Sequence, residues 1–134
     1  MHEEKLGHRI EQFNNSLATL EAAVKWENDS ENMARDSTIQ RFEYTLEMGW
    51  KLLQYILKDE RVALPVSSPR AVIKAAHATG LIADGDNWIR ALDDRNDMSH
   101  MYSGGESEGI YRRIKDVYVD IFIQLRELVN EQYI

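Results

Sequence analysis

Residues 95–102, Arg-Asn-Asp-Met-Ser-His-Met-Tyr, bring four chemically useful side chains together in one short stretch. An arginine can hold a phosphate through two parallel hydrogen bonds and stabilise developing negative charge. A histidine, with an ordinary pKa of about 6.5, can accept and donate a proton near neutral pH. Arg95 and His100 could therefore cleave RNA without a metal, the 2′-hydroxyl attacking its own phosphate. Asn96 could position the phosphate or the imidazole, and Tyr102 offers a hydroxyl beside two glycines.

The spacing of Arg95 and His100 sets a geometric condition on this chemistry. Five residues correspond to about 140° around an ideal α-helix, so the two side chains do not share a face of a continuous helix. Ser103, followed three residues later by Glu106, predicts a capping box that opens a new helix. The preceding helix then ends nearby. Both side chains can converge at that end, or pair with the same stretch of a second copy.

A purely structural interpretation of the same residues stays open at this point. Arg95 could pair on the surface with Asp93, Asp94 or Asp97, and His100 could cap the helix C-terminus. An arginine and a histidine at this spacing are by themselves a weak motif. Carboxylates near the motif disfavour RNA unless they point away from it; they are Asp84, Asp86, Asp93, Asp94 and Asp97.

Two long amphipathic helices are predicted before the motif. Apolar residues at alternating spacings of three and four predict the first over residues 4–27. Polar residues 28–30 supply caps for the second, over residues 31–59. Gly49 lies on the apolar stripe of that second helix, where it costs about 1 kcal/mol of helix propensity relative to alanine. We expect the compensation to be close approach of another helix or of a bulky ring.

Shorter helices are predicted to carry the motif. Ser68 before Pro69 is a helix start, and Gly80 a helix end. A turn at residues 84–86 leads into a short helix that reaches the motif, and a clean apolar stripe that includes Tyr118 predicts a last helix over residues 104–131. The pattern predicts one all-α domain spanning residues 1–134. Its expected architecture is an up-and-down four-helix bundle with the third rung broken into two short helices.

Composition narrows the class of protein further. The chain lacks cysteine, so disulfides, thiolate metal sites and thiol nucleophiles are excluded. A net charge of −7 argues against a broad basic nucleic-acid surface, although it permits a small anion site or a basic protein partner. The polar start and the lack of a long apolar run predict a cytoplasmic protein with no membrane span. His2, His8 and His77 have no spaced partners, so we expect solvated histidines and neither metal nor cofactor.

Three blocks of sequence resemble one known family. Residues 95–102 fit the pattern Arg-x4-His-x-Tyr, residues 41–51 resemble a second-helix motif, and residues 68–76 resemble a third block in the right order. The chain is identified as a member of the HEPN-domain family. Within it, the chain is similar to the HepT-like toxin branch, whose members are often described as nucleotidyltransferase substrate-binding proteins. The resemblance implies a helical bundle that forms a homodimer, with the arginine and histidine of both copies facing one cleft.

The resemblance also implies roles for individual residues. Arg95 and His100 correspond to the catalytic pair of an endoribonuclease, and Asn96 to the polar residue after the arginine. The implied partner is a separately encoded minimal nucleotidyltransferase, which transfers AMP to Tyr102 and silences the toxin. Glu43 is expected to support the motif from the neighbouring helix. The residue pattern alone also allows Glu43 to belong to an exposed helical ladder with Glu47 and Lys51.

Two functions follow from these patterns. The first is a HEPN toxin of a toxin–antitoxin pair: a homodimeric, metal-independent endoribonuclease neutralised by its nucleotidyltransferase. The second is a non-catalytic subunit that presents substrate to that nucleotidyltransferase, which the acidic charge also suits. The chain has no glycine-rich phosphate loop and no Gly-Ser nucleotidyltransferase motif, so we do not expect it to transfer nucleotides itself. Two departures from the family pattern are Gly49, where another small residue is usual, and Gly104-Gly105 in place of a more acidic helix start.

Overall fold

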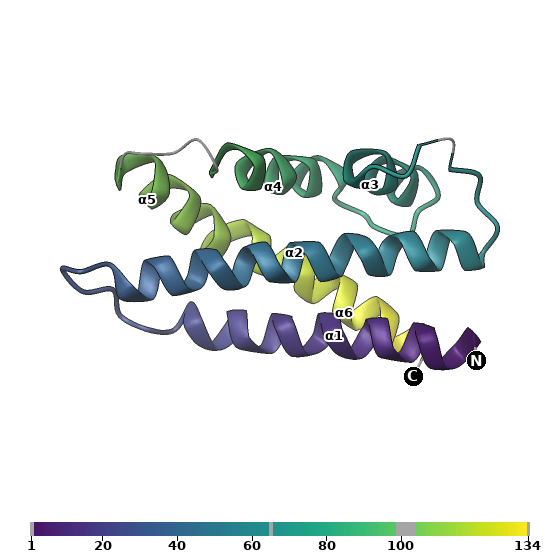
Figure 1. The fold of residues 1–134 in the computed structure, drawn as a ribbon, viewed down its shortest axis with the longest axis horizontal. Coiled ribbons are helices and arrows are strands. Elements are labelled where there is room, and N and C mark those ends of the chain that lie inside the picture. Colours follow the sequence, from purple (N-terminus) through teal and green to yellow (C-terminus); the bar gives the residue numbers. More distant parts are fainter. Residues whose placement is uncertain (1, 65, 99–103, 134) are drawn as a thin grey trace.

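The computed structural model describes residues 2–64, 66–98 and 104–133, and all the regular structure there is helical. The elements in chain order are α1 (His2–Ala23), α2 (Met33–Asp59), α3 (Pro69–Ala78), α4 (Gly85–Met98), α5 (Gly104–Arg113), η1 (Ile114–Tyr118) and α6 (Val119–Tyr133). Helices α1, α2 and α4 and the last rung, formed by α5 continuing into α6, run in alternating directions (Figure 1). The short helix α3 packs side by side with α4 and runs opposite to it. The prediction of an all-α helical bundle is confirmed. The two short helices do not follow one another along a single rung, because Arg70 at the start of α3 pairs with Asp93 near the end of α4, and His77 near the end of α3 packs on Gly85 at the start of α4.

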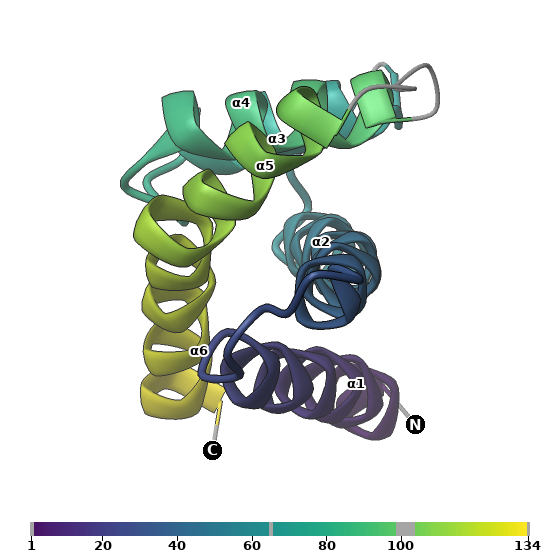
Figure 2. The same ribbon diagram turned by 90° about the vertical axis from the view of Figure 1, so that its left-hand side faces the viewer.

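Helix α2 is the central rung of the bundle. It contacts α1, α3, α4 and α5, while α6 packs against α1. Figure 2 shows α2 between α1 and the layer formed by α3 and α4. Helix α6 lies across from α2 and runs from the side of that layer to α1. Helix α2 therefore contacts each of the other rungs of the bundle. No helix within the described part of the chain is both long and apolar enough to span a membrane.

Local hydrogen bonds fix the helix ends where the sequence predicts them. The Asp29 carboxylate accepts a hydrogen bond from the backbone N–H of Met33 at 3.3 Å, at the start of α2. The Ser68 hydroxyl accepts one from the backbone N–H of Ala71 at 3.2 Å, with proline at the first position of α3. Gly80 ends the same helix with a φ of +82°, a conformation that favours glycine. These ends determine where α3 stops and α4 can begin.

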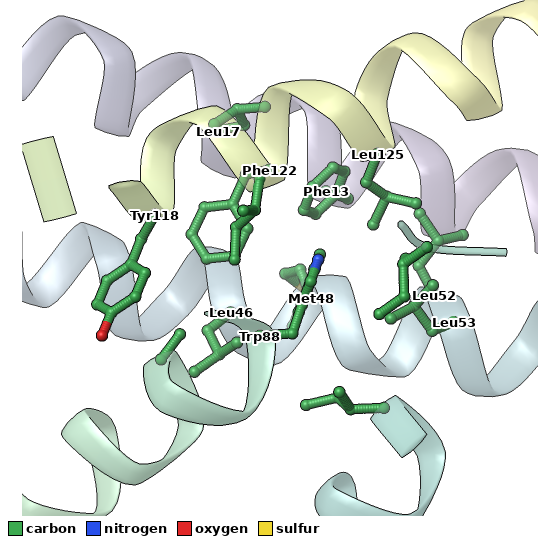
Figure 3. Close-up of a cluster of buried hydrophobic side chains, with 14 of the residues drawn as sticks. Phe13, Leu17, Leu46, Met48, Leu52, Leu53, Trp88, Tyr118, Phe122 and Leu125 are labelled. Carbon is green, nitrogen blue, oxygen red and sulfur yellow. The ribbon is translucent and has the colours of Figure 1, made fainter. Parts of the chain in front are cut away.

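A cluster of aromatic rings fills the core where the helices cross (Figure 3). The Trp88 side chain is 1% exposed and meets the Phe122 ring edge to face, with 5.3 Å between centroids. A Cβ at Gly49 would lie 3.1 Å from a Phe13 ring atom and 3.1 Å from a Trp88 ring atom. The expected compensation for Gly49 is confirmed, because two bulky rings from two other helices occupy the space that a side chain would need.

The last rung contains a feature that the sequence pattern did not predict. Between α5 and α6, residues Ile114–Tyr118 form a π-helical turn, in which the Val119 N–H donates to the Ile114 carbonyl five residues earlier. A π-helical turn inserts one extra residue into the helical repeat and commonly bends the helix. Figure 2 shows this rung changing direction between α5 and α6. The turn lies beside α4, which it contacts directly.

Candidate functional site at the end of α4

The last turn of α4 carries the first two residues of the predicted motif. Arg95 is partly buried there and Asn96 is exposed. His100, Tyr102 and the predicted cap at Ser103 lie outside the described residues. The structure therefore places the Arg-Asn half of the motif, while the His and Tyr positions remain predictions from the sequence.

Three consecutive residues of this turn interact with three different helices of the bundle. Asp93 forms an ion pair with Arg70 of α3. Asp94 turns inward to the last rung and is 8% exposed. Arg95 lies close enough to Glu43 of α2 for its charge to lower the pKa of that carboxyl group. Three neighbouring helices thus fix the position of one helical turn.

The inward-facing carboxylate of Asp94 is bound by two side chains of the last rung. The Arg113 guanidinium donates twice, from Nε to Oδ2 at 2.7 Å and from Nη2 to Oδ1 at 3.0 Å. The Tyr118 hydroxyl donates to Oδ2 as well. The hydrogen bond to Asp94 raises the pKa of Arg113, and burial together with the same carboxylate raises the pKa of Tyr118 well above its ordinary value. Both donors therefore keep their protons throughout the neutral range.

An open groove lies between α2, α4 and α5, and Glu43 is one of its lining residues. The groove has a volume of about 240 Å³, and its described lining residues are Asp36, Ile39, Gln40, Glu43, Met98 and Ser107. Burial raises the pKa of Glu43, and the positive charge of Arg95 partly offsets that rise. We call this the Glu43 groove. Its lining includes the Glu43 carboxylate, on which the charge of Arg95 acts from the last turn of α4.

A purely structural role for Arg95 predicts a surface ion pair with a neighbouring aspartate. Two of the three candidates, Asp93 and Asp94, instead bind Arg70 and Arg113. These ion pairs also reduce the negative potential near the motif, because each carboxylate has a positive partner. The acidity expected around Arg95 is therefore partly neutralised within the fold.

Two other groups of candidate residues behave as ordinary scaffold. Lys51 pairs with Glu47 one turn earlier at 3.3 Å, as the helical-ladder interpretation expected. For Glu43, the charge of Arg95 lowers the pKa of the carboxyl group. The His77 ring of α3 packs on Gly85, where a Cβ would approach within 2.5 Å of the ring. In the described ranges, no cluster of three or more histidine, aspartate or glutamate side chains could hold a metal ion.

Arg113 and Tyr118 were not among the site residues predicted from the sequence, and Asp94 was expected on the surface. Tyr118 was assigned to the core stripe, which is correct for its ring and says nothing of its hydroxyl. One available signal was a phenol on an otherwise apolar stripe, since a buried tyrosine hydroxyl usually needs a partner. The choice of Asp94 as that partner depends on a contact across 24 residues, which helical periodicity cannot reveal.

Comparisons with known proteins agree with this architecture. The family model described as "Nucleotidyltransferase substrate binding protein like" matches residues 8–131. A crystal structure of a protein from Thermus thermophilus superimposes with a TM-score of 0.72 and 32% sequence identity, covering 90% of this chain and 98% of that one. A Haemophilus influenzae protein named "Probable ribonuclease HepT" is 26% identical over 93 residues, or 67% of this chain. The matched region spans only 64% of the length of that relative.

The four-rung helical bundle and the Arg-x4-His motif define a protein of the HEPN type, in its HepT-like branch. The chain belongs to the family of nucleotidyltransferase substrate-binding-like proteins, because the family model covers nearly its whole length.

Proposed function

We propose that this protein is a metal-independent endoribonuclease acting as the toxin of a toxin–antitoxin pair. The observation that supports this most is the position of Arg95 in the last turn of α4, charge-coupled to Glu43 beside an open groove. The arginine stands at the head of an intact Arg-Asn-x3-His-x-Tyr motif. The similarity to a protein named a probable ribonuclease points in the same direction.

The proposed reaction needs only groups that the motif supplies. The 2′-oxygen of a ribose forms a bond to the adjacent phosphorus, and the bond from phosphorus to the 5′-oxygen breaks. A neutral His100 imidazole accepts the proton of the 2′-hydroxyl, and a protonated His100 imidazole donates a proton to the departing 5′-oxygen. Arg95 stabilises the charge that develops on the phosphate oxygens, and Asn96 orients the phosphate. The products are a 2′,3′-cyclic phosphate and a 5′-hydroxyl.

The active form is proposed to be a homodimer. One copy contributes a single Arg95 and a single His100, five residues apart at a helix end. A two-fold axis through this region would bring a second pair to the same cleft, so that one imidazole accepts the proton and the other donates it. Loss of cleavage on dilution below the dimer dissociation constant would support this arrangement, and a fully active monomer would refute it.

The catalytic assignment is tested by RNA cleavage in the presence of a metal chelator. Arg95→Ala should lower the cleavage rate by about 10²–10³-fold, the usual cost of removing one donor to a developing oxyanion. His100→Ala should be at least as damaging. Arg90→Ala is the matched control, because Arg90 is an exposed arginine on the same helix. Undiminished cleavage by folded Arg95→Ala and His100→Ala variants would refute the assigned roles.

The proposed antitoxin is a separately encoded minimal nucleotidyltransferase. It would join the Tyr102 phenolic oxygen to the α-phosphorus of ATP and release pyrophosphate. The added AMP carries negative charge and bulk two residues from His100, which would block access of RNA to the site. The test is the intact mass of this protein after incubation with the neighbouring nucleotidyltransferase, ATP and magnesium. An increase of one or more AMP units, absent from Tyr102→Phe, is the expected result.

A non-catalytic role is the second candidate. The net charge of −7 and the exposed Asp97 within the motif favour a surface that binds a basic protein rather than RNA. This candidate predicts a stable complex with the nucleotidyltransferase, no mass increase and no RNA cleavage by the purified protein. The chelator assay and the mass measurement together separate the two functions.

A further inference from the structure

The buried network of Asp94, Arg113 and Tyr118 has no role in the chemistry proposed above. The described lining of the Glu43 groove includes none of the three. Asp94 nevertheless immediately precedes Arg95, and its carboxylate is held by three hydrogen bonds from the last rung. A buried ion pair is an expensive way to join two helices, because desolvation offsets most of the Coulombic gain. Stability alone therefore does not explain why this ion pair lies next to Arg95.

The π-helical turn is what allows Arg113 and Tyr118 to reach the same carboxylate. Five residues apart on a regular α-helix, their side chains would diverge by about 140°. A π-helical turn has a longer repeat than an α-helix, since each N–H bonds to the carbonyl five residues before it. The turn over Ile114–Tyr118 therefore brings Tyr118 back toward the face that Arg113 occupies. As a result, both side chains bind the Asp94 carboxylate.

The same network is also connected to Glu43. The Tyr118 ring stacks on Phe42, with 5.3 Å between centroids and 20° between ring planes. Phe42 immediately precedes Glu43 on α2. Tyr118 thus contacts α2 through its ring and α4 through its hydroxyl. The residue that it contacts on each helix is the sequence neighbour of Glu43 or of Arg95.

We propose that Asp94, Arg113 and Tyr118 form a positioning unit that fixes the rotation of α4 about its axis and so directs Arg95 toward Glu43. Arg95 follows Asp94 by one residue, about 100° around the helix, so holding one side chain inward aims the other. The ion pair between Asp93 and Arg70 cannot replace this unit, since both of those side chains are substantially exposed. The consequence for activity rests on the proposed catalytic role of Arg95, whereas the geometric claim does not.

The geometric claim is tested by titrating the Glu43 carboxyl group by NMR in folded variants. Arg95→Ala should raise the pKa of Glu43, because the positive charge that lowers it is gone. Tyr118→Phe should raise it in the same direction by a smaller amount. Tyr133→Phe is the matched control: it removes a hydrogen bond from another tyrosine to a carboxylate, that of Glu60 at 3.0 Å, and should leave Glu43 unchanged.

Asp94→Asn gives a test in which the sign decides. Removing a negative charge acts by itself to lower the pKa of any nearby carboxyl group, whereas displacement of Arg95 raises the pKa of Glu43. A raised pKa in Asp94→Asn therefore supports the positioning unit. A lowered or unchanged pKa in Asp94→Asn, together with no change in Tyr118→Phe, would overturn it. If Asp94→Asn fails to fold, Tyr118→Phe alone decides, because it keeps the ring and removes only the hydroxyl.

The consequence for activity is tested by a double-mutant cycle on RNA cleavage. Asp94→Asn should lower kcat by about 10–100-fold with little change in KM, since small displacements of a catalytic group cost rate of this order. In the Arg95→Ala background the same substitution should cost less than about twofold, because the group it positions is absent. An equal loss in both backgrounds would show that Asp94 acts independently of Arg95. If Arg95→Ala keeps full activity, the proposed function fails, and the Glu43 titration still decides the positioning claim.

Discussion

The two ends of helix α4 are attached to the bundle in different ways. Near its start, Trp88 is held by apolar contact, against Phe122 and over Gly49. Near its end, Asp94 is held by charge and hydrogen bonds from the last rung. Apolar packing is strong but tolerates small rotations, whereas a bidentate ion pair specifies direction. The end that carries Arg95 has the attachment that controls orientation, so stability and positioning are divided along a single helix.

The largest stability effect is expected at the apolar end. Trp88→Ala should lower the free energy of unfolding by about 4 kcal/mol, because it removes a fully buried ring and leaves a cavity. Urea denaturation followed by circular dichroism measures this change. Trp26→Ala is the control, since that tryptophan is 47% exposed and should cost about 0.5 kcal/mol or less. Similar losses in the two variants would contradict the assignment of Trp88 as the apolar attachment.

A slightly smaller effect is expected when the charged attachment is broken. Asp94→Ala leaves the Arg113 guanidinium partly buried without its carboxylate, which should cost about 3 kcal/mol. The neighbouring Asp93→Ala removes an exposed pair with Arg70 and should cost less than about 1 kcal/mol. The same denaturation experiment compares the two adjacent aspartates. Equal losses would show that burial of Asp94 has no special energetic consequence.

Removing only the tyrosine hydroxyl should have an intermediate effect that depends on pH. Tyr118→Phe loses one hydrogen bond to a carboxylate, at a cost of about 2 kcal/mol at pH 7. The folded-state pKa of Tyr118 is raised above its unfolded value of about 10, so its contribution is complete below that pH and is lost as pH rises further.

The stability of the wild-type protein should therefore fall more steeply above about pH 10 than that of Tyr118→Phe. Tyr133, whose pKa is also raised, is present in both proteins and cancels in the difference. Parallel stability curves through the alkaline range would refute the buried hydrogen bond.

The smallest effect is expected at the glycine beneath Trp88. Gly49→Ala gains helix propensity but places a Cβ 3.1 Å from two buried rings, so we expect a net loss of about 1 kcal/mol. Gly7→Ala is the matched substitution on α1, where nothing lies within 4 Å of the new Cβ. It should stabilise the protein by up to about 1 kcal/mol. Thermal unfolding of the two variants should shift in opposite directions, and a shared direction would contradict the close packing at Gly49.

The contrast between the two ends of α4 also explains what could be predicted from the sequence. Apolar stripes, the Ser68-Pro69 start and the Gly80 end are local patterns, and they predicted the helices, including the two short ones. The antiparallel packing of α3 against α4 depends on contacts between the two helices, which local patterns do not show. The packing around Gly49 followed from one unfavourable residue on a buried stripe. Local physics therefore determines most of the fold.

The charged attachment was beyond such patterns. Asp93 and Asp94 are identical neighbours in the sequence, yet one faces α3 at the surface and the other is buried against the last rung. Helical periodicity does not identify an ion-pair partner 19 residues away. The apolar stripe of the last rung is also compatible with a regular helix, so the π-helical turn left no signal. The supporting role of Glu43 was predicted from family resemblance and stays a prediction, and the charge of Arg95 lowers the pKa of its carboxyl group.

The decisive experiment determines which chemical groups end the RNA fragments that the purified protein produces in the presence of a metal chelator. An Arg95–His100 ribonuclease predicts fragments with 2′,3′-cyclic phosphate and 5′-hydroxyl ends, strongly reduced in Arg95→Ala and unchanged in Arg90→Ala. Fragments with 5′-phosphate ends, or equal cleavage by wild type and Arg95→Ala, would contradict the assignment of the end of α4 as the catalytic site.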